Sequence, residues 1–124
     1  MKVLIIDDEK GIIKMYSEYF KMDGIQTLEA SDGNAGIKLA KEQKPDVILL
    51  DIIMPRYNGL DVLKDIKADP ELKNIPVYLL TNLPQESSGG KAKELGAQGY
   101  LVKAENEPKM VLDVIRGAAA NSQK

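Results

Sequence analysis

Four short apolar runs in this chain are each followed directly by a polar or charged residue. They are residues 3–6 before Asp7 and Asp8, 47–50 before Asp51, 77–80 before Thr81, and 100–102 before Lys103. Continuous runs of branched apolar residues are typical of strands buried on both faces, as in a parallel sheet covered by helices. Ligands bind such sheets at the carboxyl ends of the strands. The pattern therefore predicts that carboxylates, a hydroxyl and an ammonium converge at one edge of a sheet. Polar residues that only mark where strands leave the core would explain any one of these positions, but they explain the joint set poorly.

Segments with helical spacing of apolar residues separate these runs. The clearest has apolar residues three and four apart: Ile12, Ile13, Tyr16, Tyr19 and Phe20. A further short strand is predicted over residues 25–29. The least regular helix is predicted over 86–95, because paired glycines each cost roughly 1 kcal/mol relative to alanine in a helix. Strands that alternate with helices predict an α/β fold with a doubly wound, flavodoxin-like five-stranded parallel sheet in the order 2-1-3-4-5.

Length and composition restrict the function further. The chain has 124 residues, a formal net charge of -2, and no cysteine or histidine. We therefore expect one domain over residues 1–124 with no output domain visible, and neither a thiol nucleophile, nor a usual zinc site, nor a serine triad. Lysine and arginine are interleaved with acidic residues, which argues against direct nucleic-acid binding. No apolar run approaches the roughly 18 residues of a membrane span, and the first strand begins at Lys2, so we expect a cytoplasmic protein with no membrane contact.

The residues expected at the sheet edge suggest a particular chemistry. Crowded carboxylates raise one another's pKa values unless a cation lies between them, and a few oxygen ligands with room for water suit Mg²⁺ better than Ca²⁺. A carboxylate can also act as a nucleophile toward phosphorus when the incoming charge is neutralised. Lys103 and the hydroxyl of Thr81 could supply part of that neutralisation. The residues thus imply a divalent cation and are compatible with an aspartyl-phosphate intermediate.

Across the chain these motifs resemble those of receiver domains of two-component response regulators. The matching segments are Asp7-Asp8-Glu9, residues 51–59 with Met54-Pro55 and Asn58-Gly59, Thr81, and Tyr100-Leu101-Val102-Lys103. The resemblance implies a signalling domain rather than an enzyme with a separate substrate, although such a domain catalyses its own phosphotransfer and autodephosphorylation. It implies a phosphoryl donor that is a sensor histidine kinase or a histidine phosphotransfer protein. It also implies a downstream protein target on the face made by the fourth helix, the fifth strand and the fifth helix.

The same resemblance implies a role for each matching residue. Asp51 is the expected phosphoacceptor, with Asp8, Asp51 and the backbone carbonyl of Ile53 as Mg²⁺ ligands. Asp7 corresponds to the other member of the acidic pair and is counted with the metal site. The remaining roles are a switch hydroxyl, a switch aromatic and a lysine that pairs with the phosphoryl group, for Thr81, Tyr100 and Lys103. Two residues depart from the family pattern: Ala104 replaces the usual proline after the lysine, and Asn82 replaces a commonly small residue.

Other interpretations of single residues and of the whole chain remain open. Tyr100 could be only a core aromatic, Thr81 only a helix cap, and Asp7 a cap as well as a ligand. A phosphohydrolase of the haloacid-dehalogenase type would carry a second acid two residues after the nucleophile, where this chain has Ile53, which cannot transfer a proton. A flavin-binding module would present hydroxyl and glycine donors after the first strand instead of acidic residues. A receiver-like interaction domain that is never phosphorylated is the third alternative.

Overall fold

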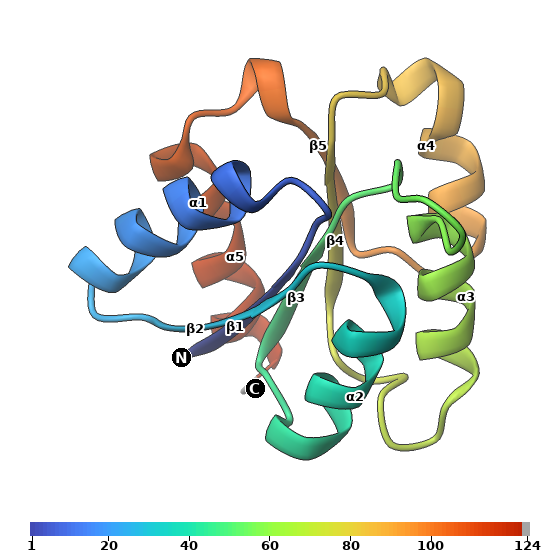
Figure 1. The fold of residues 1–124 in the computed structure, drawn as a ribbon, viewed down its shortest axis with the longest axis horizontal. Helices are drawn as coiled ribbons and strands as arrows, with labels where there is room; N and C mark the ends of the chain where they lie inside the picture. Colours follow the sequence, from blue (N-terminus) through green and yellow to red (C-terminus); the bar gives the residue numbers. More distant parts are fainter. Residues whose placement is uncertain (123–124) are drawn as a thin grey trace.

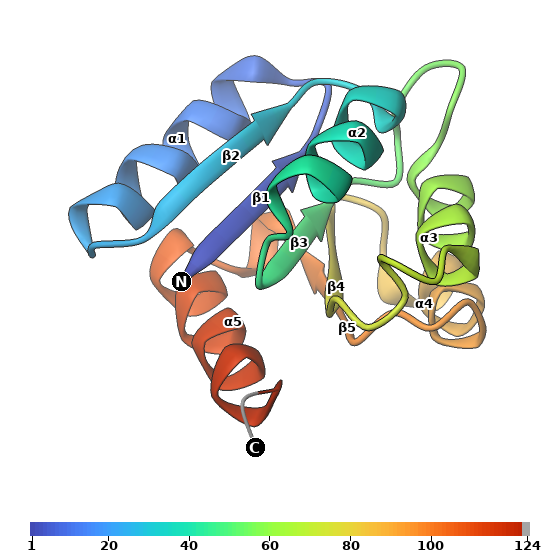
Figure 2. The same ribbon diagram turned by 90° about the horizontal axis from the view of Figure 1, so that it is seen from below.

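A five-stranded parallel sheet forms the centre of the computed structural model, which describes residues 1–122 and the side chains up to residue 117 (Figures 1 and 2). The strand order is β2-β1-β3-β4-β5, as predicted, and each neighbouring pair is parallel. The elements are β1 Lys2–Ile6, α1 Lys10–Met22, β2 Gln26–Ala30, α2 Gly33–Gln43, β3 Val47–Leu50, α3 Gly59–Ala68, β4 Val77–Thr81, α4 Gln85–Glu94, β5 Gly99–Val102, a 3-10 helix η1 Lys103–Glu105, and α5 Pro108–Ser122. Residues 123 and 124 of the predicted domain lie outside the described part of the chain.

Helices cover both faces of the sheet, with α1 and α5 on one side and α2, α3 and α4 on the other (Figure 1). Successive strand residues point to opposite faces, so the apolar runs supply both cores. In β1, Val3 and Ile5 pack toward α1 and α5, while Leu4 and Ile6 pack toward α2 and α3. This two-sided burial is why β1, β3 and β4 carry continuous apolar runs. The run in β5, expected to be buried on both faces, is only partly buried, because β5 lies at the edge of the sheet.

Local caps fix where two of the helices begin. The Asp32 carboxylate accepts the backbone N–H of Ala35 at 2.8 Å at the start of α2, and the Asn58 side-chain oxygen accepts that of Asp61 at 3.1 Å at the start of α3. Such caps satisfy donors that the first helical turn leaves without partners. No helix among residues 1–122 combines the length and apolar character needed to cross a membrane.

Two elements are shifted by one residue from the sequence-based expectation, and the strand predicted over 25–29 is β2 at Gln26–Ala30. The weakest predicted helix, over 86–95, is α4 at Gln85–Glu94, and Ala92 is its only buried residue. The last strand ends at Val102, directly before Lys103, because the chain turns at Lys103 into η1. Ala104, which stands where receiver domains usually have proline, lies within this 3-10 turn. No cis peptide bond occurs in the described chain.

Candidate functional site

Four strand ends bring the predicted polar residues together, as the apolar runs indicated. Asp7, Asp51 and Thr81 are buried directly after or at the ends of β1, β3 and β4, while Asp8 is exposed. Lys103 follows β5, and its side chain is only 6% exposed. The sheet order makes this possible, because β1, β3 and β4 are neighbours and their carboxyl ends face the same edge.

Lys103 joins the two buried carboxylates. Its ammonium donates to Asp7 Oδ2 at 2.7 Å and to Asp51 Oδ2 at 3.0 Å. Burial alone would lower the pKa of Lys103, but the hydrogen bonds to Asp7 and Asp51 outweigh that effect and the pKa is raised. The lysine therefore stays charged inside the site, where it is placed to pair with further negative charge near Asp51.

Asp7, Asp8 and Asp51 form an acid cluster with the composition of a divalent metal site. One oxygen from each of Asp7, Asp8 and Asp51 lies within 4.8 Å of the other two. Burial raises the pKa of Asp7, and the nearby charge of Asp51 adds to this, although Lys103 and the backbone N–H of Glu9 act in the opposite direction. Three carboxylates against one ammonium leave an excess of two negative charges. The donor set thus fits Mg²⁺, which takes oxygen ligands and a double charge.

The loop after β3 is shaped closely around Asp51. Asp51 Oδ1 accepts the backbone N–H of Ile53 in a long hydrogen bond of 3.4 Å, and the side chain of Ile53 is 57% exposed. Gly59 opens α3 against this loop, where a Cβ would lie 2.0 Å from the carbonyl oxygen of Asp51. Only glycine can bring the start of α3 so close to the backbone. The Asn58-Gly59 part of the motif therefore has a direct steric reason.

Thr81 and Tyr100 meet at the loop between β4 and α4. Thr81 Oγ1 accepts the backbone N–H of Leu83 at 3.4 Å, and the hydroxyl of Tyr100 donates to the backbone carbonyl of Leu83 at 2.9 Å. Tyr100 is half-buried and packs against the core, and its hydroxyl ties β5 to the loop between Thr81 and α4.

Two contacts of the site were not predicted from the sequence. Glu9 gives its backbone N–H to Asp7 Oδ1 at 2.9 Å, and Asn106 donates through its side-chain amide to the carbonyl of Val102 at 2.9 Å. The second bond closes the turn that contains Lys103 and Ala104. Asparagine side chains often hydrogen-bond to nearby backbone groups in turns. Nothing else in the sequence indicated this contact of Asn106.

Comparison with known proteins agrees with this geometry. The model of the response regulator receiver domain family matches residues 3–115. The chain belongs to this family. The receiver domain is 36% identical over 106 residues to protein PilH of Pseudomonas aeruginosa, covering 86% of this chain and 88% of that protein. It is 30% identical over 109 residues to the polar-differentiation response regulator DivK of Brucella anthropi, covering 88% and 89%.

Solved structures show the same architecture. The chemotaxis protein CheY4 of Vibrio cholerae superposes with a TM-score of 0.87 at 29% sequence identity, covering 94% of this receiver domain and 97% of that chain. The predicted flavodoxin-like fold is thereby confirmed, and the flavin-binding and haloacid-dehalogenase alternatives are not supported. Receiver domains of response regulators act in signalling based on phosphorylation, and this is the function of the family to which the chain belongs.

Proposed function

We propose that Asp51 is the phosphoacceptor of this receiver domain and that residues 1–124 act as a single signalling unit. The observation that carries the proposal is the pair of hydrogen bonds from Lys103 to Asp51 and Asp7. They hold a buried ammonium beside the one carboxylate that directly follows the central strand β3. The donor would be a phosphohistidine on a sensor histidine kinase or a histidine phosphotransfer protein.

Each site residue has a part in this reaction. An oxygen of Asp51 attacks phosphorus, the bond from phosphorus to the donor nitrogen breaks, and that nitrogen keeps the electron pair. Asp7, Asp8, Asp51 and the backbone carbonyl of Ile53 would hold Mg²⁺, which supplies positive charge next to the phosphoryl oxygens when it is bound. Lys103 pairs with the same oxygens from the β5 side.

We further propose that phosphorylation changes the face formed by α4, β5 and α5. Thr81 is buried beside the acid cluster, and its hydroxyl would turn toward the phosphoryl oxygens, away from the N–H of Leu83. The loop at Leu83 also accepts the hydroxyl of Tyr100, so a shift of this loop moves Tyr100. Helix α4 is the polar, weakly anchored part of that face. The response is a population shift and needs a phosphoryl group that favours one state.

The partner of this face would be a downstream protein rather than nucleic acid or a membrane surface, in a cytoplasmic setting. The excess of acidic residues and the interleaved charges support a protein partner. A phosphohydrolase is the weaker alternative, because the position two residues after Asp51 holds Ile53, which has no proton to transfer.

Phosphorylation by acetyl phosphate and Mg²⁺ tests the proposal. Intact mass should increase by one phosphate in the wild type and not in Asp51→Asn. Amide chemical shifts of the wild type should then change at Thr81, at Tyr100 and along α4. A wild type that gains no phosphate, or an Asp51→Asn variant that gains as much, overturns the assignment of Asp51. Shift changes confined to the surroundings of Asp51 overturn the proposed switch.

A further inference from the structure

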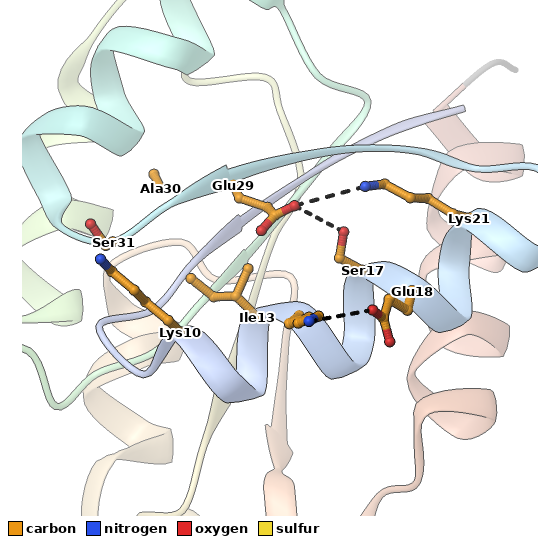
Figure 3. A pocket seen from close by; sticks show the side chains of 9 residues that line it. Lys10, Ile13, Ser17, Glu18, Lys21, Glu29, Ala30 and Ser31 are labelled. Atoms are coloured by element: carbon orange, nitrogen blue, oxygen red, sulfur yellow. Dashed lines mark hydrogen bonds and ion pairs between the residues drawn. The ribbon is translucent and has the colours of Figure 1, made fainter.

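Side-chain contacts hold α1 against β2 along a groove of about 540 Å³ that lies between these two elements (Figure 3). Ser17 donates to Glu29 Oε2 at 3.1 Å, and the ammonium of Lys21 lies 3.9 Å from the same oxygen. Lys14 and Glu18 pair with each other within α1 at 4.0 Å. These polar groups serve to position the helix. A comparable set of contacts, on the other face of the sheet, positions the loop that carries the proposed phosphoacceptor.

The β3–α3 loop, residues 51–58, contains a backbone conformation that its sequence does not favour. Arg56 is left-handed, with a φ of 68°, and the N–H of Tyr57 bonds the carbonyl of Pro55 across it at 2.8 Å. Residues with a side chain rarely adopt this conformation, which persists only where the surrounding structure enforces it. Arg56 is exposed, so packing of its own side chain does not enforce it. The restraint therefore comes from the residues beside it in the loop.

Tyr57, the next residue, is attached to both neighbouring helices. Its ring is half-buried against the core and lies so close to the start of α2 that a Cβ on Gly33 would be 2.6 Å away. Its hydroxyl donates to the Asp65 carboxylate on α3. Burial, and then the hydrogen bond to Asp65, raise the pKa of Tyr57 well above its usual value of 10.0. The hydroxyl therefore keeps its proton and remains a donor.

The β3–α3 loop has few other anchors near the phosphoacceptor. Among residues 53–56, only Met54 is buried. The N–H of Ile53 reaches Asp51 Oδ1 in a hydrogen bond that is long, at 3.4 Å. Met54 and Tyr57 both pack against the core on the side of α2 and α3. Tyr57 is thus the second point at which the middle of this loop is held.

We propose that Tyr57 is a positioning residue for the Mg²⁺ site, which holds Arg56 in its left-handed conformation and so fixes the path of the β3–α3 loop beside Asp51. The inference rests on the proposed function, in which the backbone carbonyl of Ile53 is a ligand of Mg²⁺. Without the hydroxyl bond of Tyr57, Arg56 relaxes toward negative φ and the loop takes more than one path. A ligand that must first be ordered binds the metal more weakly, because its ordering costs conformational entropy.

The variant Tyr57→Phe tests the inference, because phenylalanine keeps the ring against Gly33 and loses only the hydrogen bond to Asp65. Calorimetric titration should show Mg²⁺ binding about threefold weaker than in the wild type, a smaller loss than the roughly 10–100-fold found when a group bonded directly to a metal ligand is removed. In the metal-free protein, the carbon chemical shifts of Arg56, which report its backbone angles, should move away from left-handed values. Tyr19→Phe is the matched control, since it removes the hydroxyl of another half-buried tyrosine, on α1.

Substitutions at Arg56 distinguish restraint of the backbone from a general loss of packing. Arg56→Asn and Arg56→Gln remove the same charge, but asparagine adopts the left-handed conformation far more readily than glutamine. In the Arg56→Asn background, Tyr57→Phe should weaken Mg²⁺ binding by less than about 1.5-fold, because the backbone needs less restraint. In the Arg56→Gln background, the loss caused by Tyr57→Phe should remain about threefold.

The outcomes separate this inference from the proposed function. A loss in Tyr57→Phe that Arg56→Asn abolishes and Arg56→Gln does not supports the positioning role. An unchanged affinity in Tyr57→Phe, an equal loss in Tyr19→Phe, or equal losses in the two Arg56 backgrounds overturns that role while leaving the metal site intact. Carbon shifts of Arg56 that are not left-handed in the wild type also overturn it. A wild type that binds no Mg²⁺, or that takes no phosphate on Asp51, overturns the proposed function itself.

Discussion

Lys103, which follows the edge strand β5, donates a 2.7 Å hydrogen bond to Asp7 at the end of β1, although β3 and β4 lie between these two strands. The same ammonium reaches Asp51 on the way, at 3.0 Å. A single side chain thus spans the edge of the sheet where the acid cluster lies. The charges of this ammonium and of the three carboxylates, together with the packing of the surrounding loops, determine the stability and the reactivity expected of the site.

Replacing Lys103 with methionine should destabilise the metal-free protein by about 3 kcal/mol at pH 7, because two buried carboxylates lose their cation. Chemical denaturation in EDTA measures this. Lys41→Met is the matched control, since it removes only a surface ion pair with Asp69 and should change stability little.

The Lys103→Ala variant should still accept phosphate on Asp51, but its amide chemical shifts at Tyr100 should change much less than those of the wild type. Full-sized changes would show that Lys103 does not couple the site to the switch.

Asp7→Asn should stabilise the metal-free protein at neutral pH. The pKa of Asp7 is raised above 3.8 in the folded state, mainly by burial, so protonation favours folding. The wild type then loses stability as pH rises through this raised pKa, whereas asparagine stays neutral. The gain in unfolding free energy of the variant should shrink as pH falls toward 3.8. A variant that is less stable than wild type at pH 7 would mean that the ion pair with Lys103 outweighs the cost of burial.

Asp8→Ala should weaken Mg²⁺ binding at least about tenfold without loss of fold, because Asp8 is exposed and few protein ligands hold the ion. Asp51→Ala should have a similar effect. Calorimetric titration gives the affinities, and Asp113→Ala on α5 controls for the change in net charge. Unchanged affinity in both site variants would remove the proposed metal site.

Gly59→Ala should cost about 3 kcal/mol of folding free energy, because its Cβ would lie 2.0 Å from the carbonyl oxygen of Asp51. The control is Gly11→Ala in α1, where a Cβ meets nothing within 4 Å. That change should be neutral or stabilising by up to about 1 kcal/mol. Thermal unfolding compares the two. Equal stabilities of the two variants would show that the loop after β3 relaxes easily.

The phosphorylated state should be long-lived. Hydrolysis needs an oriented water opposite the Asp51 oxygen, and the residues two positions after Asp51 and Thr81 are Ile53 and Leu83, which cannot hydrogen-bond it. We expect the exposed Asn82, where the family commonly has a small residue, to narrow the approach of water further. Ile53→Asn and Leu83→Glu should each shorten the lifetime about tenfold, which requires only about 1.4 kcal/mol. Ile53→Leu controls for packing. The fraction of protein with the phosphorylated mass, followed over time, measures this lifetime. A wild type that loses phosphate as quickly as Leu83→Glu contradicts the prediction.

The sequence by itself determined the strands, the edge at which the site forms and the identity of its residues. Continuous apolar runs at 3–6, 47–50 and 77–80 can only be buried between two layers of helices, and the residue after each run must then lie at the same edge. The motif around Asp51 added the role of each residue through its resemblance to receiver domains. The inferences about the strands and their order succeed because they depend on local periodicity and on a parallel topology with few alternatives. The roles of the single residues stay predictions.

Tertiary structure decided how those residues share their contacts. Lys103 bonds Asp7 as well as Asp51, and Tyr100 donates to the carbonyl of Leu83, because segments far apart in the sequence meet at this edge of the sheet. The path of the turn after β5 sets the bond from Asn106 to the carbonyl of Val102. The left-handed backbone at Arg56 likewise belongs to the path of the loop after β3, where the N–H of Tyr57 bonds the carbonyl of Pro55. Periodicity specifies which face a residue occupies, but loop paths and side-chain reach set the few ångströms on which an ion pair depends.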